Sequence, residues 1–279
     1  MSSSLAFLSP GPGAVAKSPM EPGAASAGAT FEERDGWKVA TGFTDLDTER
    51  ALCASSVGFA DVSHLGKIEL QAGAEDLAAI VAAGTGGASL ELGHATRAGG
   101  VSWCPYSPTR AVVLCPAGNT AAHRDHLTAS AADADGLTSV IDITAAQGAM
   151  TILGPLAREV FARFTAIDLR PQVTPVHGWR PGSVARTGGA ILCEAPDRYL
   201  MLFGAALGQY VWTVVADAAA NLGGGPVGVD ALPPIDTPAV SLDGAAPDAA
   251  RPPLDPPAPP PLDPPGPPPL DPPGSAPDA

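Results

Sequence analysis

The sequence predicts an α+β fold with antiparallel sheets and flanking helices. Short stretches of alternating or β-branched apolar residues predict strands, and these come in pairs separated by hairpin-length gaps. Longer stretches with apolar residues three and four positions apart predict helices between the pairs. Helices that separate pairs of short strands favour an antiparallel sheet over a parallel doubly wound one. Such helix-flanked strand groups occur twice, before and after about residue 135, which indicates a duplicated half.

The predicted elements of the first group alternate along the chain. The stretch 65–71 alternates strictly and predicts a half-buried strand. Leu77, Ile80 and Val81 share one face of a predicted helix that stops at Gly84. The remaining elements are strands at 101–106 and 110–115, which form a hairpin, and a helix at 120–129.

The second group begins with predicted strands at 138–144 and 149–153. Gly154-Pro155 then opens a helix, because proline in a first turn loses no amide donor. The following elements are a Pro-containing loop at 171–181, strands at 183–192 and 198–203, and a helix at 205–222 that ends at three glycines.

Composition divides the 279 residues into three parts. Residues 1–16 are rich in Ser, Gly, Pro and Ala, and residues 233–279, the proline-rich tail, hold 19 of the 32 prolines. The tail repeats eight residues three times, as PPLDPPAP, PPLDPPGP and PPLDPPGS. Neither end can bury a core, so we expect both to be disordered and residues 17–232 to form one domain. The tail is either a solubilising spacer or a docking segment for a partner that binds PxxP.

Charge and cysteine usage exclude several classes of function. The net charge of -14 leaves no basic face for nucleic acid or anionic membranes. No apolar run approaches the ~20 residues of a membrane span, and the N-terminus lacks the basic region of a signal peptide. The four cysteines form no CxxC pair, so buried free thiols are expected, and no cluster predicts a metal site. We expect a cytoplasmic soluble protein.

Four segments in order resemble one family. The first is Val57-Gly58-Phe59-Ala60-Asp61-Val62-Ser63-His64-Leu65-Gly66-Lys67-Ile68-Glu69-Leu70. The others are a lead-in at 17–37, a strand at 140–144 with the turn and helix at 153–160, and a closing strand and helix at 198–232. Together they resemble the folate-binding domain of the glycine-cleavage T-protein (aminomethyltransferase) and of short relatives such as the gamma chain of heterotetrameric sarcosine oxidase.

The resemblance implies tetrahydrofolate as a cofactor and points to four candidate binding residues. Asn119 corresponds to an Asn near the pterin in that family, and an amide can both donate to and accept from a pterin edge. Arg186 is the candidate cation for the glutamate tail of folate. Asp61 and His64 form a polar strand entrance near the ligand cavity. Each has a structural alternative: Asn119 as a helix N-cap, Arg186 as a surface arginine, and Asp61 and His64 as a local turn.

The sequence departs from the family where the family places its chemistry. A segment like Gly99-Gly100-Val101 leads there into an acidic pair with the catalytic carboxylate, whereas this chain has Ser102-Trp103, neither of which can act as acid or base. The folate-clamping Gly-Tyr-Thr-Gly-Glu segment is replaced by Gly188-Gly189-Ala190-Ile191 after Arg186-Thr187. No catalytic residue is therefore assigned.

The sequence thus predicts a folate-binding or accessory protein of one-carbon metabolism with little or no transferase activity. The alternative is a gamma-like structural subunit that binds no folate and docks onto an amine-oxidising flavoenzyme. A third interpretation is an enzyme that uses another carboxylate, Asp142 or Asp125.

Overall fold

The computed structural model describes residues 11, 13–132, 134 and 136–235. Their α+β architecture confirms the predicted fold class, with helices packed on sheets that are almost entirely antiparallel. The predicted disordered segment 1–16 falls mainly, and the three tail repeats fall entirely, outside the described residues.

The five-stranded sheet contains most of the first predicted group. Its strands, in spatial order, are β6 (Thr96–Ala98), β7 (Val101–Ser107), β8 (Arg110–Cys115), β5 (Gly66–Gln71) and β9 (Ser139–Asp142). Every neighbouring pair is antiparallel. The helices α3 (Ala74–Thr85) and α4 (Thr120–Ala131) cover one face of this sheet through Leu77, Ile80 and Leu127.

The six-stranded sheet contains the second group. Its strands, in spatial order, are β11 (Trp179–Val184), β12 (Thr187–Ala195), β13 (Arg198–Gly204), β10 (Gln147–Leu153), β4 (Gly58–Asp61) and β14 (Gly225–Pro226). Its outer face packs against α1 (Glu21–Ser26), α5 (Ala157–Phe161) and α6 (Gly208–Ala220).

The two sheets repeat one topology, as the duplicated strand groups predicted. In each sheet a hairpin, β7–β8 or β12–β13, pairs with the strand that opens its half, β5 or β10. A short edge strand extends the hairpin, β6 or β11, and a further strand flanks the opening strand on the other side, β9 or β4. These flanking strands are exchanged between the halves, because β4 precedes β5 in sequence but pairs with β10, and β9 precedes β10 but pairs with β5.

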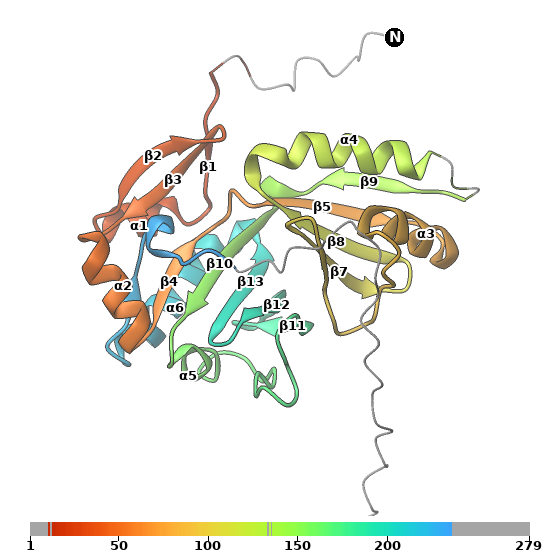
Figure 1. The fold of residues 1–279 in the computed structure, drawn as a ribbon. Helices are drawn as coiled ribbons and strands as arrows, with labels where there is room; N and C mark the ends of the chain where they lie inside the picture. The colour runs from red at the N-terminus through yellow and green to blue at the C-terminus, as the bar shows by residue number, and fades with distance from the viewer. Residues whose placement is uncertain (1–10, 12, 133, 135, 236–279) are drawn as a thin grey trace, which may run out of the picture. The chain divides into compact units, whose positions relative to one another are not determined.

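The sheets stack with their inner faces together, which gives four layers in the order helices, sheet, sheet, helices (Figure 1). Strand alternation produces this arrangement, since successive side chains point to opposite faces. On β13, Tyr199 and Met201 face the helices whereas Leu200 and Leu202 face the other sheet. We call the layer between the sheets the inter-sheet core. Its buried members come from both halves: Ala95, Cys104, Val112, Leu114, Ala149, Trp179, Ala190, Leu192, Leu200 and Leu202.

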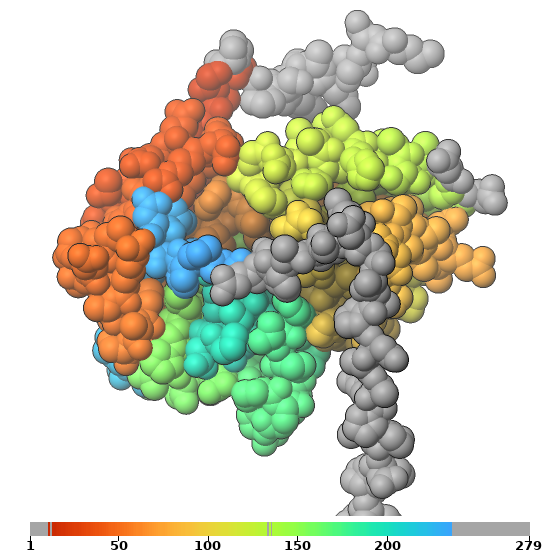
Figure 2. All heavy atoms as spheres, in the orientation of Figure 1, coloured from red at the N-terminus to blue at the C-terminus, as the bar shows by residue number. Residues whose placement is uncertain are grey.

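The N-terminal part adds elements that the sequence analysis does not assign. These are the three-stranded sheet of β1 (Ala16–Lys17), β3 (Trp37–Gly42) and β2 (Thr30–Arg34), and the helix α2 (Leu46–Ser55). Buried Glu49 of α2 joins them to the chain's later part, because its Oε2 accepts a hydrogen bond from the backbone N–H of Gly228 at 2.7 Å. Figure 2 shows this C-terminal stretch, in blue, at the surface beside the N-terminal residues.

Three element boundaries differ from the prediction. Helix α3 continues through Gly84 to Thr85, and Gly86 caps it with a positive φ of 72° that suits glycine. The ring of Trp103 packs closely against Gly84 inside the helix. The predicted strand 183–192 is broken by a turn at Ala185 and Arg186, both with positive φ. The helix after Gly154-Pro155 is only five residues long and starts at Ala157, after the proline.

Candidate functional site

The turn between β4 and β5 holds two of the predicted site residues. Asp61 is buried, and its Oδ1 accepts a hydrogen bond from the backbone N–H of Ser63 at 3.0 Å. Burial raises the pKa of Asp61, while hydrogen bonds from Ser18 and Ser63 oppose the rise. The local-turn role that the sequence offers for Asp61 is therefore present in the structure.

Buried Lys67 is the cation of this turn, and sequence reasoning missed it. Its Nζ donates to the backbone oxygens of Ser63 at 2.8 Å and Leu65 at 2.7 Å. Burial lowers the pKa of Lys67 to about 8, although the charges of Asp61 and Asp142 oppose the change. Strand alternation places Lys67 on the polar face of β5, but the six-stranded sheet covers that face, so the strand is not half-buried there.

His64 lies beside the same cation. Burial, and secondly the charge of Lys67, lower the pKa of His64 to about 4, with Asp35 acting in the opposite direction. The imidazole is therefore neutral at physiological pH and can both donate and accept one hydrogen bond.

A groove of about 590 Å³ opens next to this turn. We call it the Asp142 groove; its lining residues are Asp35, Trp37, Ala117, Gly118, Thr120, Ala121, Asp142, Thr144 and Ala145. Asn119 ends the 3-10 turn Ala117–Asn119 before α4, is exposed, and makes no side-chain capping bond. The N-cap role that the sequence offers for Asn119 is thus not made through its side chain.

None of the four predicted residues lines this groove, but two of them, Asn119 and His64, lie beside its lining residues. Asn119 lies between two of its lining residues, and His64 feels the charge of lining Asp35. The charge of Lys67 lowers the pKa of Asp61 as well as that of His64. Arg186 is elsewhere: it is exposed at the tip of the β11–β12 hairpin, where the hydroxyl of Tyr210 donates to the neighbouring Ala185 oxygen at 3.1 Å.

Strand β7 carries the position where the resemblance requires a carboxylate. Trp103 points to the helices, in the core of α3 and α4, whereas Cys104 belongs to the inter-sheet core. Alternation therefore places Ser102 on the inter-sheet side, where it is 8% exposed. A neutral hydroxyl occupies this place in the layer between the sheets.

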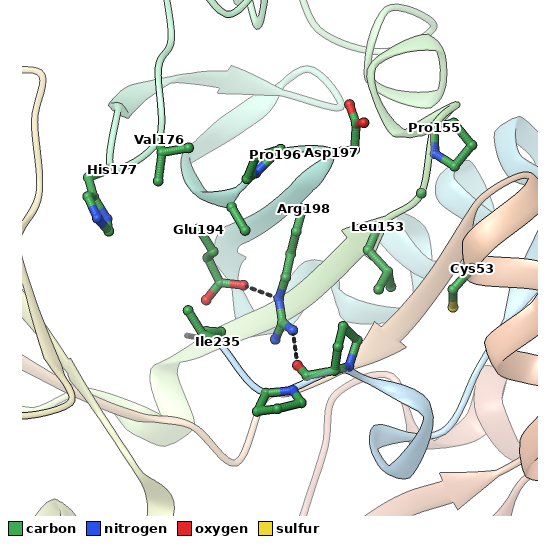
Figure 3. Close-up of a pocket in the computed structure, with 14 residues that line it drawn as sticks. Cys53, Leu153, Pro155, Val176, His177, Glu194, Pro196, Asp197, Arg198 and Ile235 are labelled. Carbon is green, nitrogen blue, oxygen red and sulfur yellow. Dashed lines mark hydrogen bonds and ion pairs between the residues drawn. The ribbon is translucent and has the colours of Figure 1, made fainter. Parts of the chain in front are cut away.

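A second cavity, of about 480 Å³, carries a buried ion pair that the sequence analysis missed. We call it the Glu194 pocket; Figure 3 shows Glu194 and Arg198 pointing toward one another on its wall. Arg198 Nε donates to Glu194 Oε2 at 2.9 Å, and both residues are 9% exposed. Arg198 also donates through Nη1 to the backbone oxygen of Pro233, so residues 233–235, which the sequence assigns to the tail, line this pocket.

The electrostatics of the Glu194 pocket follow from its depth. Burial raises the pKa of Glu194, whereas Arg198 and, more weakly, the charge of Arg97 oppose the rise. Burial and the charge of Glu194 raise the pKa of Cys104 across the inter-sheet core. The charge of Glu194 therefore acts on β7, the strand that carries Cys104 and Ser102.

A sequence signal for this ion pair exists in the alternation of β12 and β13. Leu192 and Leu200 face the other sheet, and the charged residues stand two positions beyond and two before them. A charged residue at the next position of an otherwise apolar strand face indicates either that the strand ends there or that the charge is buried in an ion pair. The sequence cannot decide between them, because the closing segment 233–235 is distant along the chain.

Comparisons with known proteins place the fold. No protein-family model matches the chain, and no curated protein matches it. Among solved structures, glycine cleavage system aminomethyltransferase T from Bartonella henselae superposes with a TM-score of 0.63 over 78% of this chain at 18% identity. This chain spans 60% of that protein. A chain of the heterotetrameric sarcosine oxidase from Corynebacterium sp. U-96, in complex with pyrrole 2-carboxylate, superposes with a TM-score of 0.54 over 63% of this chain and 92% of its own length, also at 18% identity.

These likenesses confirm the T-protein-like fold. Within the described ranges, no helix has the length and apolar content that a membrane span requires.

Proposed function

We propose that this chain is a folate-binding or accessory protein of one-carbon metabolism without aminomethyl transfer of its own. One observation carries the proposal: in a fold like that of an aminomethyltransferase, the inter-sheet face of β7 presents Ser102 where the resemblance requires a carboxylate. A serine hydroxyl cannot hold and release a proton at neutral pH as a carboxylate does.

The Asp142 groove is the proposed folate site. It offers one large aromatic wall, Trp37, against which a flat pterin can pack, and it is bordered by Asn119, which can donate and accept. Thr120 and Thr144 add hydroxyls to the lining. Neutral His64 and buried Asp61, near the β4–β5 turn beside the groove, are proposed to hold its shape. Arg186, on another hairpin, remains a proposed contact for the glutamate tail.

Activity and binding are tested separately. We expect the pure chain to show no tetrahydrofolate-dependent aminomethyl transfer, even when it binds tetrahydrofolate. Turnover that persists after removal of contaminating enzyme would refute the loss of activity, and loss of that turnover in Asp142→Asn or Asp125→Asn would identify the substitute carboxylate.

Asn119→Ala and Trp37→Phe are expected to weaken folate binding. Arg186→Gln is expected to weaken the binding of a polyglutamylated folate more than the binding of a monoglutamate.

The second candidate function is a structural subunit of an amine-oxidising flavoenzyme. It is favoured by the coverage of 92% of a chain from a heterotetrameric sarcosine oxidase, because the shared fold takes in nearly all of that subunit. Co-expression with the amine-oxidase subunits encoded by the same organism, followed by size-exclusion chromatography, tests it. A stable complex without folate affinity would favour this candidate over the first.

A further inference from the structure

The Glu194 pocket presents opposite charges side by side on one wall. Glu194 and Arg198 are each more than nine-tenths buried, yet both line a cavity of about 480 Å³. That volume lies within the range of small-molecule sites. The lining also contains Asp197, whose exposed carboxylate pairs with Arg158. The buried carboxylate of Glu194 and the guanidinium of Arg198 complement a small ligand that carries one cation and one anion.

The ion pair keeps bonding capacity for such a ligand. A guanidinium has five N–H donors, and the bonds to Glu194 and to the oxygen of Pro233 use two of them. Figure 3 shows the bond from Arg198 reaching one of the two carboxylate oxygens of Glu194. The Pro233 oxygen is a neutral acceptor, and a carboxylate in its place would make a bond about twice as strong.

Five apolar residues of the lining can pack against an apolar side chain of a ligand. Cys53, Leu153, Pro155, Val176 and Ile235 line the pocket together with the ion pair. Burial of apolar ligand surface against them adds to affinity, and the charged wall fixes the orientation.

We propose that the Glu194 pocket binds a small zwitterionic α-amino acid. Its ammonium group lies on Glu194, its carboxylate takes Arg198 in place of the Pro233 oxygen, and its side chain packs on the apolar lining. A ligand with a carboxylate alone would face the charge of Glu194 without compensation, and an amine alone would face Arg198. The proposal goes beyond the folate function and does not depend on it, because different residues line the Asp142 groove.

The test uses the full-length wild-type chain. The twenty L-amino acids are screened by thermal shift, and the best ligand is compared by calorimetry with its decarboxylated amine and its deaminated acid. We expect the amino acid to bind at least tenfold more tightly than either analogue. If none of the twenty binds, or if one analogue binds as tightly as the amino acid, the proposal is overturned.

A matched pair of variants locates the site. Glu194→Gln keeps the shape and removes the charge, and we expect at least a tenfold loss of affinity. Glu69→Gln removes the glutamate of the ion pair with Arg110, which lies outside the pocket, and should change affinity less than twofold. Equal affinities of both variants and wild type would overturn the assignment. The analogue comparison needs no variant, so it decides the ligand class even if Glu194→Gln does not fold.

Discussion

The hairpins β7–β8 and β12–β13 occupy the same place in the two halves, yet their ion pairs differ in environment. Arg110 opens β8 and Arg198 opens β13, and each pairs with a glutamate. The Arg110 side chain is 45% exposed, binds Glu69 of the neighbouring strand and stacks on Tyr106 with 4.9 Å between the guanidinium carbon and the ring centroid. The Arg198 side chain is 11% exposed and lies in the Glu194 pocket.

The two halves differ in whether another segment of the chain covers the start of the hairpin's second strand. Arg198 is closed in by Pro233 and Ile235, which come from beyond the second half, whereas Arg110 stays at the surface. An exposed ion pair is screened by water and contributes little to stability. Removing one partner of a buried pair is strongly destabilising, because it leaves the other charge buried and unpaired. The first residue of the hairpin's second strand therefore forms an exposed ion pair in one half, through Arg110, and part of a candidate site in the other, through Arg198.

Replacing the two arginines is expected to give the largest difference in stability between the two hairpins. Arg198→Met leaves Glu194 buried without its cation and should lower the free energy of unfolding by about 3–5 kcal/mol. Arg110→Met removes an exposed pair and should cost at most about 1 kcal/mol. Urea unfolding followed by tryptophan fluorescence measures both. Equal costs would break the distinction between the two hairpins.

Lys67 supplies a second contrast, because its equivalent by hairpin register in the other half is Ala149. The folded pKa of Lys67 is about 8, below the ordinary value of 10.5, so the unfolded chain holds more protons between these values and stability rises with pH there. The free energy of unfolding of wild type minus that of Lys67→Met should therefore increase by about 3 kcal/mol from pH 8 to pH 10.5. Unfolding curves in reducing buffer at several pH values measure it. A difference independent of pH would show that Lys67 titrates normally.

Two glycines that lie against aromatic rings test whether both cores are equally tight. A Cβ on Gly84 would lie 2.4 Å from a ring carbon of Trp103, and one on Gly148 would lie 2.5 Å from a ring carbon of Phe203. Gly84→Ala and Gly148→Ala should each lower stability by about 1–3 kcal/mol through overpacking. Gly204→Ala, with open space around the added carbon, serves as the control and should change stability by less than about 0.5 kcal/mol. An unchanged free energy of unfolding in Gly84→Ala would indicate that the Trp103 ring can move aside.

The smallest expected effect is at the turns that open the two hairpins. The β6–β7 turn uses Gly99 and Gly100, whereas the β11–β12 turn places Ala185 and Arg186 at positive φ. The left-handed conformation costs a side chain about 1–2 kcal/mol, and glycine loses about 0.5–1 kcal/mol in chain entropy, so Arg186→Gly should stabilise by about 0.5 kcal/mol. Thermal unfolding measures the change. Destabilisation of similar size would point to contacts of the Arg186 side chain that outweigh its backbone strain.

Much of the fold follows from local sequence, and much of the site does not. Short apolar runs at 110–115 and 198–203 predict strands, and residues 120–129 predict a helix, all of which the structure contains within a few residues. The stretch 183–192 misleads, because its turn lacks the glycines that mark the equivalent turn at 99–100. The pattern around Lys67 predicts exposure, since nothing local shows that a second sheet covers β5.

The candidate site residues also divide into those that local sequence indicates and those that it does not. The resemblance to a known family points to Asp61, His64 and Asn119, which lie in two segments next to β5. Glu194 and Arg198 owe their burial to Pro233, about 35 residues further along the chain, and no local pattern contains that contact. Long-range closure, rather than secondary structure, is what sequence reasoning lacked.

The most direct test of the proposed function is a calorimetric titration of the full-length chain with tetrahydrofolate, with Trp37→Phe as the matched variant. Saturable micromolar binding that weakens in the variant is the expected result and would place the ligand in the Asp142 groove. The absence of binding at millimolar tetrahydrofolate would contradict the folate function and leave the subunit role as the account of this fold.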